Sequence, residues 1–217
     1  MSQDTSPVPG GTVGIDEAGR GCVLGDLVVA GFYVEAVDDE ALRAAGADDS
    51  KRLSRKRRNA ARVALATLGT PRVECITPTQ IDAGNLNTLE EEAIVRIVRH
   101  FRPATVYMDA LGAPATLPKL LARLQAALPD DLTPEWIIEP KADGTYPVVG
   151  AASIMAKTTR DDALDDLATW GTLGSGYPSD PKTRGWLLDH ARKGEPWPFF
   201  VRTRWQTVQD LAQQALL

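Results

Sequence analysis

Short apolar runs alternate with longer periodic patterns along the first two thirds of this chain. The short runs are rich in β-branched residues, as buried strands are, and they cover 12–17, 27–34, 72–77, 104–108 and 136–138. The second run is expected to pair back on the first as a hairpin. Helical patterns separate the later runs, and strands that alternate with helices predict an α/β fold in which helices pack on a sheet.

Helical patterns cover 54–68, 88–102 and 117–128, and the first two also have end signals. Ser54 can cap the first, because its hydroxyl can accept from the free N–H groups of a first turn. The apolar stripe of that helix is expected to consist of Val63, Ala64, Leu65 and Leu68. Thr88 and Glu91 have the spacing of a capping box, which would open the second helix.

The periodicity also divides the chain into three parts. Residues 1–11 are polar and rich in Pro and Gly, so we expect a disordered lead. Residues 12–149 contain all the strand patterns and form the expected α/β core. After Pro147 only helical patterns follow, so 150–217 is expected to be a helical portion packed on the core.

Composition fits a chain of 217 residues that folds around one sizeable core. No apolar stretch reaches the roughly 20 residues that span a bilayer, and no secretion signal precedes the first strand. Two cysteines do not make a disulfide framework, so we expect a cytoplasmic protein. We also expect a monomer. The net charge is -5, but the basic residues are concentrated in one segment, which contains Lys51, Arg52, Arg55, Lys56, Arg57, Arg58 and Arg62.

Acidic side chains follow several of the apolar runs. Asp16 and Glu17 come at the end of the first strand pattern, just before a Gly-Arg-Gly turn, and Asp109 ends the fourth. Asp143 lies in a polar loop after the fifth. Because ligand sites in α/β sheets gather at strand ends, these acids can meet although they are far apart in sequence. Glu17 points elsewhere in a regular strand, so it would join through a break in the strand or through its carbonyl oxygen.

Oxygen donors without His or Cys suit Mg²⁺ or Mn²⁺ rather than zinc. Paired ions of this kind serve phosphodiester hydrolysis, where they activate water and neutralise the charge of the leaving oxygen. Lys141, Arg160 and the basic segment could hold the rest of a nucleic-acid strand, although a basic segment can equally be a solvated face. The two histidines, His100 and His190, are expected to be surface or packing residues.

The motifs along the chain resemble type 2 ribonuclease H, the ribonuclease HII family, in its archaeal branch. They are Gly-Ile-Asp-Glu-Ala-Gly-Arg-Gly at 14–21, Asp-Ser-Lys at 49–51, Asp109 after a strand, Lys-Ala-Asp at 141–143 with the helix that follows, Gly-Ser-Gly-Tyr-Pro at 174–178, and Val201-Arg202 with Trp205. They extend from about residue 12 to 208. The resemblance implies an RNase H-like fold with a central mixed sheet flanked by helices.

The resemblance also implies an endonuclease that cuts RNA within RNA–DNA hybrids and beside single ribonucleotides embedded in duplex DNA. It places Asp16, Glu17, Asp109 and Asp143 at the metal-binding acids. It places the turn of Gly19, Arg20 and Gly21 against the ribonucleotide and Tyr177 against the adjoining deoxynucleotide sugar. Lys51 and Lys141 are further expected substrate contacts.

Two departures from the family pattern lie next to its signature, where Cys22 and Asp26 replace common prolines. A small buried thiol is the expected role of Cys22, and Asp26 adds negative charge near the expected metals. The tail 206–217 lacks the paired aromatic residues of a sliding-clamp motif, which argues against clamp binding through it. Alternative interpretations are a resolvase or exonuclease of similar fold, a non-catalytic nucleic-acid-binding protein and a metal-dependent phosphatase.

Overall fold

The computed structural model describes residues 10–47 and 53–215. Contacts divide the chain into two compact units, each built from separate stretches. The first unit comprises 1–17, 29–74 and 90–158, and the second comprises 18–28, 75–89 and 159–217. The expected boundary at 149/150 differs from this division, because the second unit also takes up the turn after the first strand and the segment 75–89.

A five-stranded sheet of order β3-β2-β1-β4-β5 forms the centre of the first unit, and a few end residues of β1, β2 and β3 belong to the second. The strands are β1 (Thr12–Ala18), β2 (Leu27–Val34), β3 (Thr70–Ile76), β4 (Thr105–Asp109) and β5 (Glu135–Glu139). Strand β4 runs parallel to both β1 and β5. The short connection from β1 to its neighbour β2 fits the expected hairpin, since a parallel crossover needs about a dozen residues or more.

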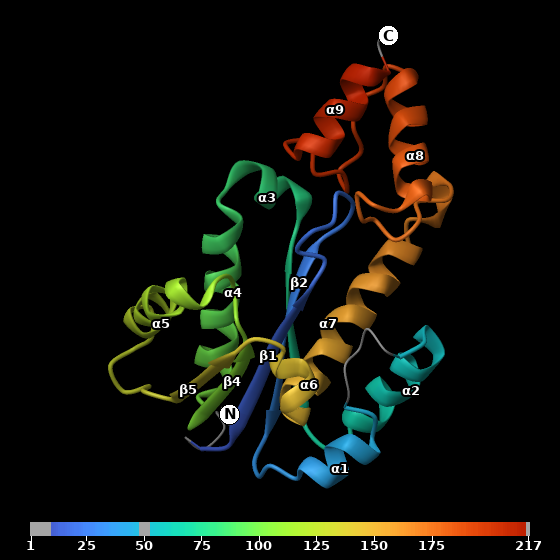
Figure 1. Cartoon of the computed structure of the whole chain (residues 1–217). Helices are drawn as coiled ribbons and strands as arrows, with labels where there is room; N and C mark the ends of the chain where they lie inside the picture. The colour runs from blue at the N-terminus through green and yellow to red at the C-terminus, as the bar shows by residue number, and fades with distance from the viewer. Residues whose placement is uncertain (1–9, 48–52, 216–217) are drawn as a thin grey trace, which may run out of the picture. The chain divides into compact units, whose positions relative to one another are not determined.

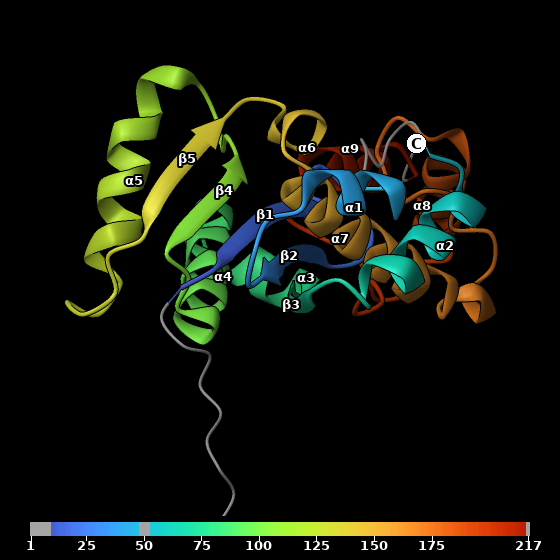
Figure 2. The same ribbon diagram turned by 90° about the horizontal axis from the view of Figure 1, so that it is seen from below.

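The helices of the first unit are α1 (Asp39–Ala44), α2 (Arg55–Leu65), α4 (Leu86–Phe101), α5 (Leu117–Ala126), α6 (Ala142–Thr145) and the start of α7 (Pro147–Asp165). A 3₁₀ turn, η1 (Pro114–Thr116), precedes α5. The RNase H-like arrangement of a mixed sheet with flanking helices is confirmed (Figures 1 and 2).

Two glycines place helices on opposite faces of the sheet. A Cβ at Gly14 of β1 would lie 2.2 Å from the carbonyl oxygen of Val148, so α7 packs directly on this face. A Cβ at Gly31 of β2 would lie 2.3 Å from Ile97 of α4 and 3.4 Å from Val13. Because Val13 and Gly14 are neighbours on one strand, they face opposite sides, and α4 therefore covers the face opposite α7 (Figure 2).

The second unit has its own apolar core between helices. It contains α3 (Pro78–Ala83), the end of α7, the 3₁₀ turn η2 (Ala168–Trp170), α8 (Pro181–Arg192) and α9 (Gln206–Gln214). Its buried cluster comprises Val23, Leu24, Leu173, Leu187, Phe200, Val201, Val208 and Leu211. His190 is 5% exposed and its ring stacks on Trp186 and Trp197, which confirms its packing role. His100 is an exposed residue with its ring against Phe101.

Two local predictions differ from the structure. The stripe of α2 is only partly the expected one: Leu65 is buried as predicted, but Val63 and Leu68 are 72% and 42% exposed, and Ala61 is buried in their place. The helix α4 begins before Thr88, with the side chain of Asn85 accepting from the first turn.

A capping box does occur, but at Thr77 and Gln80 of α3. Of the expected disordered lead, residues 1–9 lie outside the described residues. Gly10 and Gly11 are held by the hydroxyl of Tyr33 and the N–H of Ala104. No helix among the described residues is long and apolar enough to cross a membrane.

Candidate active site

Asp16 and Asp109 lie side by side on the face of the sheet that α7 covers. The parallel register pairs Gly14 with Tyr107 and Ile15 with Met108, so the next residues along both strands are Asp16 and Asp109. Side chains alternate along a strand, which puts Asp16 on the same face as Gly14. The hydrogen bond between the Asp16 carboxylate and Ser153 of α7 agrees with this placement.

Asp143 reaches this region through the short helix α6, where it is 6% exposed. The chain turns from β5 into α6 at Lys141, which adopts a left-handed conformation with φ 62° and ψ 35°. This conformation is uncommon for a residue with a side chain. It directs the N–H of Lys141 to Oδ1 of Asp109, 2.6 Å away, and the same oxygen accepts from Ala110 at 2.9 Å. The main chain therefore fixes the Asp109 carboxylate.

The three carboxylates interact electrostatically. Burial, followed by repulsion from Asp143 and Asp109, raises the pKa of Asp16 to about 6, against the favourable hydrogen bonds of Ser153 and the Glu17 N–H. A buried acid with a raised pKa beside other acids is a site that a cation would stabilise. Sequence reasoning misses Ser153, because a serine within an apolar helical run has no distinguishing signal.

Glu17 does not share this face. Strand β1 stays regular through Ala18, so the Glu17 side chain points to the side opposite Asp16. Within 10–47 and 53–215, no three His, Cys, Asp or Glu side chains lie close enough together to hold a metal ion as they stand. The oxygen donors of Asp16, Asp109 and Asp143 fit a hard divalent cation that would draw them together.

The Gly-Arg-Gly turn lies in the second unit and is closed by a hydrogen bond from the N–H of Cys22 to the carbonyl of Gly19, at 3.1 Å. Gly19 has φ 87°, and a Cβ there would lie 2.7 Å from the carbonyl of Asp26, so this position requires glycine. Gly21 is exposed, and its φ lies outside the left-handed region. The guanidinium of Arg20 donates to the side chain of Asn87.

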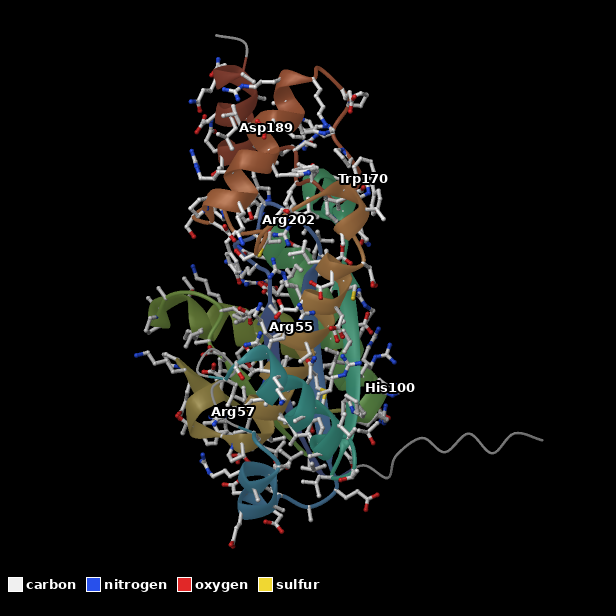
Figure 3. The ribbon with its side chains drawn as sticks, turned by 90° about the vertical axis from the view of Figure 1, so that its right-hand side faces the viewer. Arg55, Arg57, His100, Trp170, Asp189 and Arg202 are labelled. Atoms are coloured by element: carbon white, nitrogen blue, oxygen red, sulfur yellow. The ribbon has the colours of Figure 1, made fainter. Side chains whose placement is uncertain are left out.

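Arg202, labelled in Figure 3, lies near the end of the chain and binds the main chain of this turn. It is fully buried and donates from Nη2 to the Gly19 carbonyl at 2.8 Å, from Nη1 to the Arg20 carbonyl at 3.1 Å, and from Nε to the Gly25 carbonyl at 3.0 Å. Burial lowers its pKa to about 10, so the group is charged at neutral pH. Asp26, half-buried, interacts electrostatically with this arginine, and burial raises the pKa of that acid.

Tyr177 lies beside the turn, with its ring edge 3.8 Å from where a Cβ of Gly21 would be. The guanidinium of Arg160 lies 5.2 Å from the centre of the ring. Burial, together with the nearby Cys22 thiol, raises the pKa of Tyr177 to about 12. The expected role of Cys22 as a small buried thiol is confirmed, and its sulfur accepts from Nη2 of Arg160 at 3.1 Å.

Arg160 is 3% exposed, so its expected role as a phosphate contact is wrong. Its Nη2 donates to the carbonyl of Ser175, and its Nη1 lies 3.3 Å from the Asp161 carboxylate. The buried charge therefore fixes the loop 174–178 and supports the ring of Tyr177. Sequence reasoning places Arg160 in the right neighbourhood but cannot distinguish a buried guanidinium from an exposed one.

The basic segment continues into α2, where Arg55, Lys56, Arg57 and Arg62 are exposed and Arg58 is half-buried. Figure 3 shows Arg55 and Arg57 on this helix. Arg58 donates to the carbonyl of Leu53 at 2.7 Å. Lys51 and Arg52 lie outside the described residues. Lys141 is exposed, and its main chain rather than its side chain contacts the acids.

Comparison with solved structures defines the class of the protein as a ribonuclease H. The ribonuclease H2 of Pyrococcus horikoshii superposes with a TM-score of 0.85 at 34% identity, over 95% of this chain and 99% of that one. The ribonuclease HII of Archaeoglobus fulgidus, solved in a complex with PCNA, superposes with a TM-score of 0.82 at 36% identity, over 92% and 96%.

Sequence comparison identifies the family. The family model for ribonuclease HII matches residues 13–208, and the ribonuclease HII of Aeropyrum pernix is 43% identical over 207 residues, 92% of this chain and 89% of that protein. The chain belongs to the ribonuclease HII family and is a ribonuclease H enzyme that acts on RNA–DNA hybrids. This finding excludes the resolvase, phosphatase and non-catalytic interpretations.

Proposed function

We propose that this ribonuclease H uses a divalent cation, Mg²⁺ or Mn²⁺, and also incises duplex DNA at single embedded ribonucleotides. The convergence of Asp16, Asp109 and Asp143 from two strands and a short helix carries the first part of the proposal. When bound, the cation would activate water and stabilise charge on the phosphate. The carboxylates would hold it, together with the main-chain carbonyl rather than the side chain of Glu17.

The protein's contribution at this site is to fix its ligands in advance. The main-chain N–H groups of Ala110, Lys141 and Ala142 all donate to Oδ1 of Asp109, so Oδ2 remains available as a ligand. Ser153 similarly orients the Asp16 carboxylate. These hydrogen bonds orient the Asp16 and Asp109 carboxylates before a cation binds, so binding has only to bring the three acids closer together.

Recognition of the ribonucleotide is assigned to the second unit. The 2′-hydroxyl is the only chemical mark that separates RNA from DNA at one nucleotide, and it both donates and accepts. The exposed turn at Gly21 lets main-chain groups approach that hydroxyl, since no side chain intervenes. The ring of Tyr177 lies beside the turn, where it would pack on an adjoining sugar that lacks a 2′-oxygen.

Binding of a sliding clamp is a further question for this chain, because the ribonuclease HII of Archaeoglobus fulgidus forms a complex with PCNA. In this chain the segment 206–217 contains no aromatic residue. We infer that a clamp, if it binds this protein, is not engaged through a pair of aromatic side chains in this segment. Deletion of 212–217 should therefore leave binding of the purified clamp unchanged, as measured by calorimetry, and a loss of binding would contradict the inference.

Labelled duplexes that contain no, one or several ribonucleotides test the proposed activity. With Mg²⁺ or Mn²⁺ we expect cuts at the single ribonucleotide and within the longer RNA tract, and none in all-DNA duplex. EDTA and the Asp109→Asn variant should abolish both cuts, because an amide cannot supply the charge that holds the cation. Cutting that persists in EDTA would refute the metal assignment, and cutting of the long tract alone would refute single-ribonucleotide incision.

A further inference from the structure

Arg202 is a buried cation whose hydrogen bonds all go to main-chain carbonyls. Its side chain is 0% exposed and donates to Gly19, Arg20 and Gly25, and no carboxylate among the described residues forms an ion pair with it. Removing a guanidinium from water is costly unless its donors are satisfied. Because the guanidinium donors of Arg202 are satisfied by carbonyls of residues 19–25, we expect this side chain to fix the conformation of that segment.

The carbonyls that Arg202 holds decide which groups of the turn remain accessible. The Gly19 carbonyl accepts from both Arg202 and the Cys22 N–H, and the Arg20 carbonyl accepts from Nη1 of Arg202. Both carbonyls are therefore directed into the protein. Gly21 is exposed, and its N–H donates to no group in the described part of the chain. A turn with inward carbonyls presents its N–H groups to a ligand oxygen.

We propose that Arg202 is a positioning residue for ribonucleotide recognition, which it serves by holding the Gly19 and Arg20 carbonyls inward so that the Gly21 N–H can donate to a 2′-hydroxyl. This inference rests on the proposed role of the turn. Arg202 acts through the main chain and touches no substrate. The specificity of the enzyme for a ribonucleotide then depends on a residue more than 180 positions away in the sequence.

The backbone around Arg202 is itself fixed, so the guanidinium has a defined direction. The Arg202 N–H donates to the Val23 carbonyl at 3.0 Å, and the next residue, Thr203, donates from N and Oγ1 to Asp82, both at 2.7 Å. The guanidinium also lies 5.3 Å from the centre of the Trp205 ring. A planar fork can reach three carbonyls at once, whereas a lysine ammonium is a single point on a flexible stem.

Arg202→Lys keeps the charge and removes the fork, and binding in EDTA measures its effect without cleavage. The probe is a fluorescent DNA duplex with one ribonucleotide, and the all-DNA duplex of identical sequence is the comparison. The readout is the Kd of the all-DNA duplex divided by the Kd of the ribonucleotide duplex. We expect Arg202→Lys to reduce this ratio by about threefold or more, the effect of one misdirected hydrogen bond. The Kd of the all-DNA duplex should not change.

Leu187→Ala is the matched control, because Leu187 is fully buried in the apolar cluster of the same unit and lies outside the turn and the loop of Tyr177. It should lower the melting temperature and preserve the Kd ratio. If Arg202 only stabilised the fold, Arg202→Lys would lower the melting temperature and leave the Kd ratio unchanged, as Leu187→Ala should. If Arg202→Lys does not fold, hydrogen exchange of the wild-type amides tests the geometry of the turn. The Cys22 N–H should be protected in the free protein, and the Gly21 N–H should become protected only when the ribonucleotide duplex is bound.

The outcomes separate this inference from the proposed function. A wild-type protein that binds both duplexes equally would refute ribonucleotide recognition by the turn, and with it the role of Arg202. If the wild type discriminates and Gly21→Ala does not, the proposed function stands. Arg202→Lys with an unchanged Kd ratio, or a Gly21 N–H that the ribonucleotide duplex leaves unprotected, would then overturn the inference about Arg202.

Discussion

Replacing Asp16 with asparagine should stabilise the protein in the absence of metal while removing its activity. The Asp16 carboxyl is 8% exposed, and burial and the neighbouring acids raise its pKa from 3.8 to about 6. At about pH 7 the Asp16 carboxyl is ionised in both the folded and the unfolded chain. Ionisation is less favourable in the folded state, so it lowers the free energy of unfolding. A pKa rise of this size corresponds to about 3 kcal/mol of lost stability.

The raised pKa of Asp16 makes the free energy of unfolding depend on pH. Between the unfolded and the folded pKa the native state binds more protons than the unfolded state, so the free energy of unfolding falls as pH rises through this window. The penalty is small near pH 4, grows through pH 4 to 6 and is complete above about pH 7. Asparagine cannot ionise, so the variant lacks this loss and should gain about 2 kcal/mol relative to wild type between about pH 4.5 and about pH 7.

Urea unfolding of both proteins in EDTA at several pH values measures the effect. The wild-type protein should gain stability when Mg²⁺ or Mn²⁺ is added at neutral pH, because a ligand that binds only the folded state stabilises it by mass action. The Asp16→Asn variant should gain less. A variant that is less stable than wild type by the same amount at every pH would refute the reasoning, since it would show that Asp16 is not held at an energetic cost.

Three further outcomes follow from packing and charge. Gly14→Ala should cost about 1–3 kcal/mol of stability, because its Cβ would meet the Val148 carbonyl. Gly185→Ala, with no atom near its Cβ, is the control, and equal urea midpoints for the two variants would contradict this packing. Replacing Arg55 and Arg57 of α2 with glutamine should weaken binding to all duplexes alike and reduce the salt dependence of Kd, whereas an unchanged salt slope would identify a solvated face. Tyr177→Ala should reduce cutting at single ribonucleotides more than in long hybrids, and equal losses in kcat/KM would show that the ring does not read the junction.

The sheet and its acids can be predicted because they depend on local patterns. The prediction for strand β2 has both ends correct, and the parallel strands β1 and β4 bring Asp16 and Asp109 to the same end of the sheet, as expected from their places late in the two strand patterns. The stripe of α2 is mispredicted because the helix is rich in arginine and alanine. Leu65 is buried as predicted, but the other buried residue is Ala61, and a small residue carries little signal in a pattern.

The parts that cannot be predicted are contacts between distant segments and main-chain groups. The left-handed Lys141 and its hydrogen bond to Asp109 depend on how β5 turns into α6. Arg202 reaches the carbonyls of residues near the start of the chain, and a sequence pattern does not encode a carbonyl as a partner. The sequence misidentifies Arg160 as a phosphate contact for the same reason, because only packing shows that its charge is buried.

The central claim is that Asp16, Asp109 and Asp143 hold a divalent cation in one site. Crystals soaked in Mn²⁺ test it most directly, because anomalous scattering locates the ion without assumptions about the ligands. We expect an anomalous peak bonded to oxygens of these three carboxylates, and no such peak in crystals of the Asp109→Asn variant. A peak elsewhere in crystals of active enzyme, with these carboxylates free of metal, would contradict the account.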